Sequence, residues 1–165
     1  MELQHYNSKW NAMYQEESNL ITSAFDSDEF IDVQHIGSTA ITDMASRPII
    51  DIAVLVTPDE FIQGYVRPLS KIGYTLDTSK SSPEQLFFVK GDPVSYHLTI
   101  TQEGMTPYWD RHIALREYLT AHTEKAKEYE SLKRHLLELD PSGGQAYVNG
   151  KSAFISNILQ SSQNE

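Results

Sequence analysis

Residues 33–56, VQHIGSTAITDMASRPIIDIAVLV, constrain the fold more than any other stretch of this chain. The residues before Gly37 favour a strand, and Gly37 removes the Cβ where the backbone must turn. Arg47 and Pro48 end any helical segment before the next strand, because the residue preceding a proline disfavours helical backbone angles. Residues 49–56 are nearly all apolar, which is typical of a strand buried on both faces. The stretch therefore predicts two strands joined by a Gly-Ser turn and a short polar helical segment.

Asp51 is the one charged residue in the second of these strands. Burying a carboxylate is costly unless a partner or a ligand compensates its charge. Asp51 is therefore the first candidate for chemistry. The alternative is a structural role, in which its carboxylate accepts hydrogen bonds from backbone N–H groups.

The remaining segments predict helices and one hairpin. Apolar residues at helical spacing predict a helix over about residues 8–25 and a second helix from Thr57, which Pro68 kinks or breaks. Strands over residues 86–90 and 95–101 form a hairpin.

The spacing of apolar residues predicts helices from residue 108 onwards, so we expect residues 108–160 to form a helical C-terminal part. The order of elements indicates an α+β fold, a mixed sheet with helices packed on it and a C-terminal helical bundle. A length of 165 residues fits a single domain over residues 1–165.

The composition excludes several classes of protein. The formal net charge is −10, whereas a general nucleic-acid-binding protein needs a basic face to displace counterions from phosphates. A small nucleotide or phosphorylated metabolite stays open as a partner, because a few local cations suffice to bind it. The chain has no cysteine, no signal-peptide pattern and no apolar run of membrane-spanning length, so we expect a cytoplasmic protein without disulfides or membrane contacts.

Several motifs resemble those of the GrpB family. The central match is a His-Ile-Gly-Ser-Thr turn, followed by a basic residue with proline and by an apolar strand that carries an aspartate. The resemblance continues to the closing helices and covers nearly the whole chain. The matching residues are His35, Ile36, Gly37, Ser38, Thr39, Arg47, Pro48, Asp51, Tyr96, His97, Leu98, Trp109, Arg111, Leu115, Arg116, Tyr118, Leu119, Tyr129, Leu132, Lys133, Tyr147 and Lys151.

The GrpB family is similar to nucleotidyltransferases of the polymerase-β type, and this resemblance implies a nucleotidyltransferase-like fold. In that superfamily a Gly-Ser turn offers backbone N–H groups and a hydroxyl to phosphate. Two carboxylates that flank one apolar residue in a strand point the same way and hold Mg²⁺ or another divalent metal. Gly37, Ser38 and Asp51 match this pattern, but Ala53 stands where the second carboxylate is expected.

Two histidines can complement Asp51. His35 lies just before the Gly-Ser turn, and His97 belongs to the polar face of its strand, because alternate residues of a strand share a face. Two imidazoles and one carboxylate are found in transition-metal sites and in general acid–base catalysis. We therefore predict Asp51, His35 and His97 as catalytic residues, and Asp51 and His97 as metal ligands. The alternative for His97 is a satisfied, partly buried imidazole.

The turn and the nearby cations supply a predicted phosphate or nucleotide site. Several cations that converge on one turn of an acidic protein can form an anion pocket, whereas the alternative for each of them is a surface ion pair. The predicted members of this site are Gly37, Ser38, Thr39, Arg47, Arg111, Arg116, Lys133 and Lys151.

Three functions remain open at this point. The first is a nucleotidyltransferase-like enzyme that transfers a nucleotidyl group to a small acceptor, with Ser38 on the phosphates and Asp51 on a metal. The second is a degenerate relative that binds a nucleotide or phosphorylated metabolite without turnover, which Ala53 favours. The third is a His/Asp metal-dependent enzyme with another type of reaction.

Overall fold

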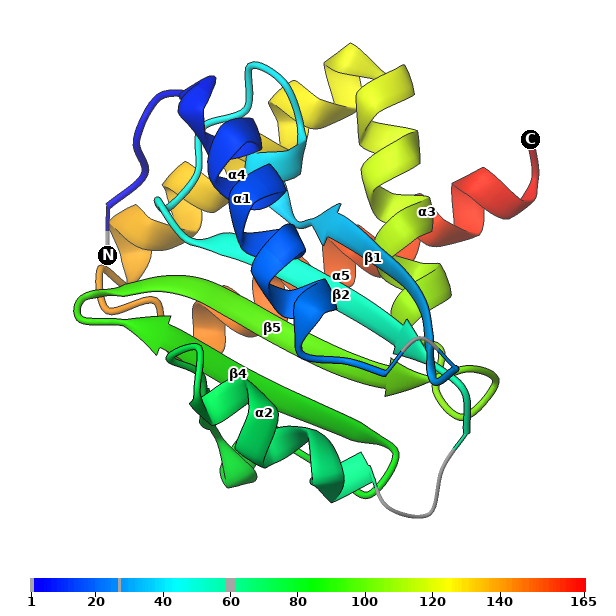
Figure 1. The fold of residues 1–165 in the computed structure, drawn as a ribbon. Helices are drawn as coiled ribbons and strands as arrows, with labels where there is room; N and C mark the ends of the chain where they lie inside the picture. The colour runs from blue at the N-terminus through cyan, green and yellow to red at the C-terminus, as the bar shows by residue number, and fades with distance from the viewer. Residues whose placement is uncertain (1, 27, 59–61) are drawn as a thin grey trace.

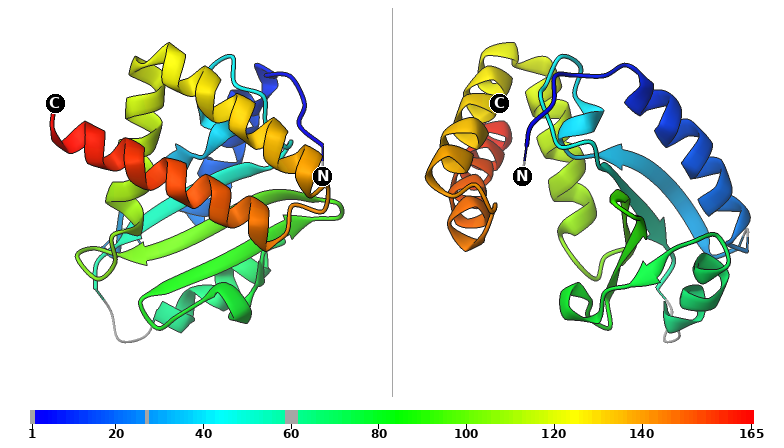
Figure 2. Two further views of the ribbon diagram at one scale, coloured as in Figure 1. Left: turned by 180° about the vertical axis from the view of Figure 1, so that it is seen from behind. Right: turned by 90° about the vertical axis from the view of Figure 1, so that its left-hand side faces the viewer.

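The computed structural model describes residues 2–26, 28–58 and 62–165. A central sheet carries helices on both faces (Figure 1). Figure 2 shows the first helix and the short second helix on one side of the sheet, and the three C-terminal helices on the other. The strands are β1 (Phe30–Ile36), β2 (Ile50–Val56), β3 (Thr75–Leu76), β4 (Gln85–Gly91) and β5 (Val94–Gln102), and the helices are α1 (Lys9–Ser23), α2 (Val66–Ser70), α3 (Tyr108–Ala121), α4 (Thr123–Leu139) and α5 (Gln145–Gln163).

The sheet is mixed, as the sequence predicts. Its strand order is β1-β2-β5-β4-β3, with β2 and β5 parallel and every other neighbouring pair antiparallel. Asp51 of β2 lies opposite Ile36 on one side and beside His97 of β5 on the other. Laterally paired residues project to the same face, so Asp51 and His97 share a face.

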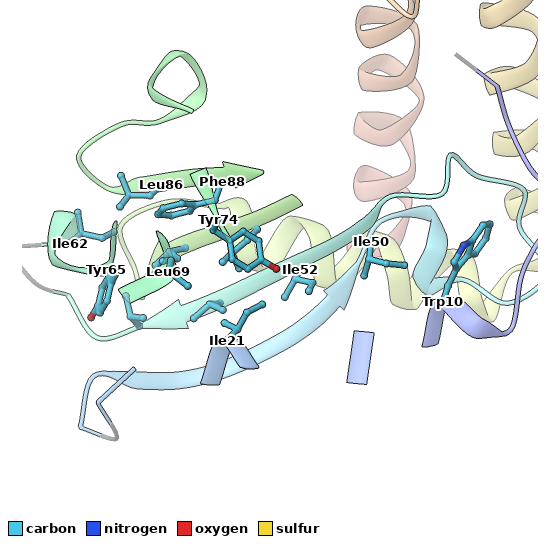
Figure 3. Packing of buried hydrophobic residues seen from close by; sticks show 14 residues of the cluster. Trp10, Ile21, Ile50, Ile52, Ile62, Tyr65, Leu69, Tyr74, Leu86 and Phe88 are labelled. Atoms are coloured by element: carbon cyan, nitrogen blue, oxygen red, sulfur yellow. The ribbon is translucent and has the colours of Figure 1, made fainter. Parts of the chain in front are cut away.

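The main core lies between the sheet and α1 and α2. The apolar residues of β2, β4 and β5 that project to this face meet the buried side of α1, at Trp10 and Ile21, and residues of α2 such as Leu69 (Figure 3). Burying each such side chain stabilises the fold by about 1.5–3 kcal/mol. Leu20, which the spacing places near the same side, is exposed instead.

Glu17 is the polar residue on the buried side of α1, and the fold supplies it with partners. Its carboxylate accepts hydrogen bonds from Lys90 Nζ at 2.6 Å and from the Tyr74 hydroxyl at 2.9 Å. This pairing compensates a charge that would otherwise be costly to bury. Burial, and the neighbouring Glu17 carboxylate, raise the pKa of Tyr74, which stays a neutral donor.

The predicted helix from Thr57 is shorter than expected. Its proposed start includes residues 59–61, which lie outside the described residues, and the visible part is a 3₁₀ turn, Ile62–Tyr65, followed by α2. Pro68 is the third residue of α2, where its missing N–H has no intrahelical partner to lose. At the other end of the chain, α5 continues to Gln163, beyond the expected end at residue 160.

A second, smaller core joins the three C-terminal helices to the loop between β1 and β2. It contains Ile41 and Met44 of the loop, Leu115 and Leu119 of α3, and further residues of α4 and α5. These residues pack on one another and do not belong to the core under the sheet. The C-terminal helices therefore pack against the loop between β1 and β2. A space remains between these helices and the sheet.

Candidate functional site

A hollow of about 230 Å³ lies between the β1–β2 loop, the start of β2 and the three C-terminal helices. Asp51 faces it with a side chain that is 37% exposed. The strand is thus not buried on both faces at this position, which corrects the expectation from its apolar sequence. We call this space the anion hollow. Its polar lining residues are Ser38, Ser46, Arg47, Asp51, Tyr108, His112, Arg116, Tyr129, Lys133, Tyr147 and Lys151.

Gly37 allows the turn to approach Asp51. Its φ angle is 75°, in a region that only glycine adopts without strain. A Cβ on Gly37 would lie 2.5 Å from Asp51 Oδ2, closer than any real contact. The glycine of the motif therefore lets the backbone of the turn, which continues into the 3₁₀ turn Ser38–Ala40, pass close to the Asp51 carboxylate.

Lys133 of α4 reaches the turn from the opposite side of the hollow. The residue is 2% exposed, and its Nζ donates to Ser38 Oγ and to the carbonyl of Ala45, both at 2.9 Å. The same helix holds the N–H of Ala45 through Glu130 Oε2, at 2.9 Å. Burial, together with the neighbouring charge of Lys151, lowers the pKa of Lys133 to about 7.

Each lysine of the hollow lies over a tyrosine ring of its own helix. Lys133 Nζ is 4.9 Å from the centre of the Tyr129 ring, and Lys151 Nζ is 4.5 Å from that of Tyr147. Burial, and the charge of Arg47 beside it, lower the pKa of Lys151. Each pair is four residues apart, a spacing at which helical side chains meet.

Within the described residues, Arg47, Lys133 and Lys151 have no carboxylate within 4 Å. Buried or half-buried cations normally have an acidic partner, because desolvation opposes their charge. Three such cations around one hollow form a positive site inside a protein of net charge −10. An anionic ligand would supply the missing compensation.

Three other residues of the predicted phosphate site have different surroundings. Arg116 lines the hollow, but its Nη1 donates to Gln34 Oε1 at 2.8 Å and to the His35 carbonyl at 2.9 Å, so it ties α3 to β1. Thr39 is buried away from the hollow, and Arg111 is exposed and lines a neighbouring hollow instead. These three residues differ from the other predicted members of the phosphate site in the direction of their side chains, which the sequence does not specify on a turn or a helix.

The three predicted catalytic residues do not share one hollow. His97 Nδ1 lies 3.1 Å from Asp51 Oδ1, and its ring is beside Phe87. His35 pairs with Ile52, so it projects to the opposite face, where it stacks on Tyr14 with ring centres 4.8 Å apart. Its Nε2 lies 2.9 Å from Thr39 Oγ1. Burial lowers its pKa to about 4, which keeps the imidazole neutral. The expectation that His35 faces the same space as Asp51 is therefore wrong.

The residues present do not fit a two-carboxylate metal site. Among the described residues, no three His, Cys, Asp or Glu side chains gather closely enough to hold a metal ion. Ala53, at the second carboxylate position, is 0% exposed, so that position does not open on the hollow. A lone carboxylate with an imidazole is a weak set of donors for Mg²⁺, which prefers several oxygen ligands.

Four aromatic residues of the hollow were not singled out as site residues from the sequence. Tyr129 and Tyr147 belong to the GrpB resemblance, and Tyr108 and His112 fall within the predicted helical part, residues 108–160. The spacing of Tyr129 with Lys133, and of Tyr147 with Lys151, is a signal that could have marked the first two.

Comparisons with known proteins agree with this architecture. The model of the family described as GrpB protein matches residues 1–161. The chain belongs to the GrpB family. The GrpB protein of Enterococcus faecalis has a crystal structure that superposes with a TM-score of 0.87 at 28% identity, over 98% of this chain and 96% of that one.

One further sequence relative and one neighbour in fold give the extent of the likeness. The UPF0157 protein YqkA of Bacillus subtilis is 34% identical over 151 residues, which are 91% of this chain but only 43% of YqkA. The poly(U) polymerase Cid1 superposes with a TM-score of 0.55 at 10% identity, over 86% of this chain and 45% of Cid1. At that identity the likeness concerns the fold alone, and this GrpB-family chain has a nucleotidyltransferase-like fold. None of its described helices is both long and apolar enough to cross a bilayer.

Proposed function

We propose that this chain binds the phosphate groups of a nucleotide or another phosphorylated small metabolite in the anion hollow. One observation carries the proposal: Arg47, Lys133 and Lys151 surround the hollow without a carboxylate within 4 Å among the described residues. The Ser38 hydroxyl adds a neutral hydrogen-bonding group at the same place. Charge-assisted hydrogen bonds to phosphate oxygens would satisfy all four groups.

The fold neighbours support the choice of phosphate over other anions. Cid1 has been crystallised with MgATP and with MgGTP, and its fold resembles that of this chain. The acidic overall charge supports a small ligand rather than a long nucleic acid, because only a local site is positive.

Nucleotidyl transfer to a small acceptor is the second candidate. It is favoured by Asp51, which faces the hollow beside the Gly37-Ser38 turn as one carboxylate of a nucleotidyltransferase would. The buried Ala53 argues against the usual two-carboxylate chemistry, so binding without turnover is the better-supported function.

Inorganic tripolyphosphate is the probe that separates these two functions. We expect calorimetry to detect its binding in EDTA, without Mg²⁺. Asp51→Asn should strengthen binding severalfold, because this isosteric change removes a negative charge from the hollow. Lys133→Met should weaken binding by about tenfold or more, whereas Lys127→Met, an exposed position of the same helix, should leave it unchanged.

Two results would change the conclusion. Absence of tripolyphosphate binding to the wild-type chain would overturn the proposed phosphate site. Binding that needs Mg²⁺ and is lost in Asp51→Asn would favour the transferase, and formation of a nucleotidylated product would then decide for it.

A further inference from the structure

A second hollow, of about 380 Å³, adjoins the anion hollow between the start of α3, α5 and the first residue of β4. Tyr108, His112, Leu115 and Ile155 line both spaces, so the two hollows share a wall. The residues that line only the second hollow carry one positive charge, that of Arg111, and no negative charge. Ligand pockets typically have volumes of about 300–1,000 Å³. The second hollow is thus large enough for an organic group attached to a phosphate in the first.

Tyr108 and His112 form the aromatic part of the shared wall. The rings of Tyr108 and His112 lie with centres 4.1 Å apart at an angle of 36°. Thr99 Oγ1 donates to the Tyr108 hydroxyl at 3.1 Å, which fixes that ring against the sheet. Burial lowers the pKa of His112, so its ring is a neutral, flat surface at pH 7. Flat aromatic groups bind to such a surface by stacking.

Several polar groups beside this wall have hydrogen-bonding capacity that no described residue uses. The His112 ring nitrogens and the Arg111 guanidinium make no hydrogen bond to any described residue. Gln85 accepts a hydrogen bond from Thr106 Oγ1 at 3.2 Å through its Oε1, which leaves its amide nitrogen as a donor. A few hydrogen-bonding groups around an apolar or aromatic wall are what a specific small-molecule site needs.

We propose that the second hollow binds a nitrogen heterocycle of the nucleobase type, stacked on the Tyr108–His112 wall, while its phosphates lie in the anion hollow. The inference rests on the proposed phosphate site and narrows the ligand class from any phosphorylated metabolite to a nucleoside phosphate. A sugar phosphate would leave the stacking surface unused. A base has both a π face for the wall and an edge for Gln85, His112 and Arg111.

Calorimetry with tripolyphosphate, ribose 5-phosphate, ATP and UTP tests this inference on the full chain. At least one of the two nucleotides should bind about tenfold more tightly than tripolyphosphate, because stacking of one base is worth roughly 1–3 kcal/mol. His112→Ala and Arg111→Gln should each weaken binding of that nucleotide by at least threefold more than they weaken binding of tripolyphosphate. Lys127→Met serves as the control for surface charge.

The outcomes distinguish the two proposals. Equal affinity for tripolyphosphate and both nucleotides, or a loss in His112→Ala that affects all ligands alike, overturns the base site while the phosphate site stands. Arg111 is exposed, so Arg111→Gln still tests the base site if His112→Ala does not fold. If tripolyphosphate does not bind at all, the phosphate site fails, and the base site fails with it.

Discussion

The amine of Lys133 on α4 donates a hydrogen bond to the hydroxyl of Ser38 at 2.9 Å, across 95 positions of sequence. This contact joins the C-terminal helices to the turn between β1 and β2. It also leaves a buried cation beside a space that can admit a ligand.

Lys133→Met should separate binding from stability. Removing a buried cation without a close carboxylate relieves a desolvation cost, which offsets the loss of two hydrogen bonds worth about 1 kcal/mol each. We expect the free energy of unfolding to change by less than about 1 kcal/mol while tripolyphosphate binding weakens by about tenfold or more. Urea denaturation and calorimetry measure the two quantities. Severe unfolding with unchanged residual binding would contradict a ligand-binding role.

Affinity for phosphate should fall as pH rises above about 7. The pKa of Lys133 is lowered to about 7, by burial, by Lys151, and by Arg134 and Arg47, while Glu130 opposes the shift. A bound anion favours the protonated amine, so binding above pH 7 takes up a proton. Titrations at pH 6 to 9, in two buffers with different ionisation enthalpies, measure that uptake. A pH-independent affinity in the wild type, or an unaltered pH dependence in Lys133→Met, would contradict the assignment to Lys133.

Stability without ligand should change with pH in the opposite direction. The folded chain holds Lys133 at a pKa of about 7, whereas the ordinary value is 10.5. Between these values the unfolded chain binds a proton that the folded chain does not, so the free energy of unfolding rises with pH, by at most about 1.4 kcal/mol per pH unit. Below pH 7 and above pH 10.5 this contribution is flat. Urea denaturation of the wild type and of Lys133→Met should differ in slope in this window and nowhere else.

Gly37→Ala should destabilise the chain and damage the site. An alanine at φ 75° is strained by about 1–3 kcal/mol, and its Cβ would collide with the Asp51 carboxylate. Gly104→Ala is a matched control, because Gly104 has the same φ of 75° and no atom within 4 Å of an added Cβ. A larger loss of stability and of tripolyphosphate affinity in Gly37→Ala than in Gly104→Ala is the expected result. Equal losses would mean that the approach of Asp51 does not matter.

Lys90→Met should destabilise the main core by about 2 kcal/mol, because among the described residues it leaves only the Tyr74 hydroxyl as a hydrogen-bond donor to the Glu17 carboxylate. A double-mutant cycle with Glu17→Gln, followed by urea denaturation, isolates the pair. Lys125→Met removes a comparable pair on the surface and should cost less than about 1 kcal/mol. Coupling near zero between Glu17 and Lys90 would show that the buried pair is not stabilising.

The sequence determined the local elements, because these depend on neighbouring residues. The Gly37 turn, the stop at Pro48 and the apolar strand after it are set by backbone sterics and by the alternation of side chains. The same motif placed Gly37, Ser38 and Asp51 together, since a turn between antiparallel strands keeps its two ends close.

Tertiary structure decided which side chains meet across the molecule. His35 and Asp51 belong to paired strands, but a shift of register by one residue exchanges the two faces, so sequence alone could not assign His35 to the α1 side. Lys133 and Lys151 could be assigned to helices from their spacing. The hollow that both lysines line exists because those helices pack on the β1–β2 loop and not on the main core. The sequence does not specify this space, because the hydrophobic effect is non-directional and favours any packing that buries the same apolar surface.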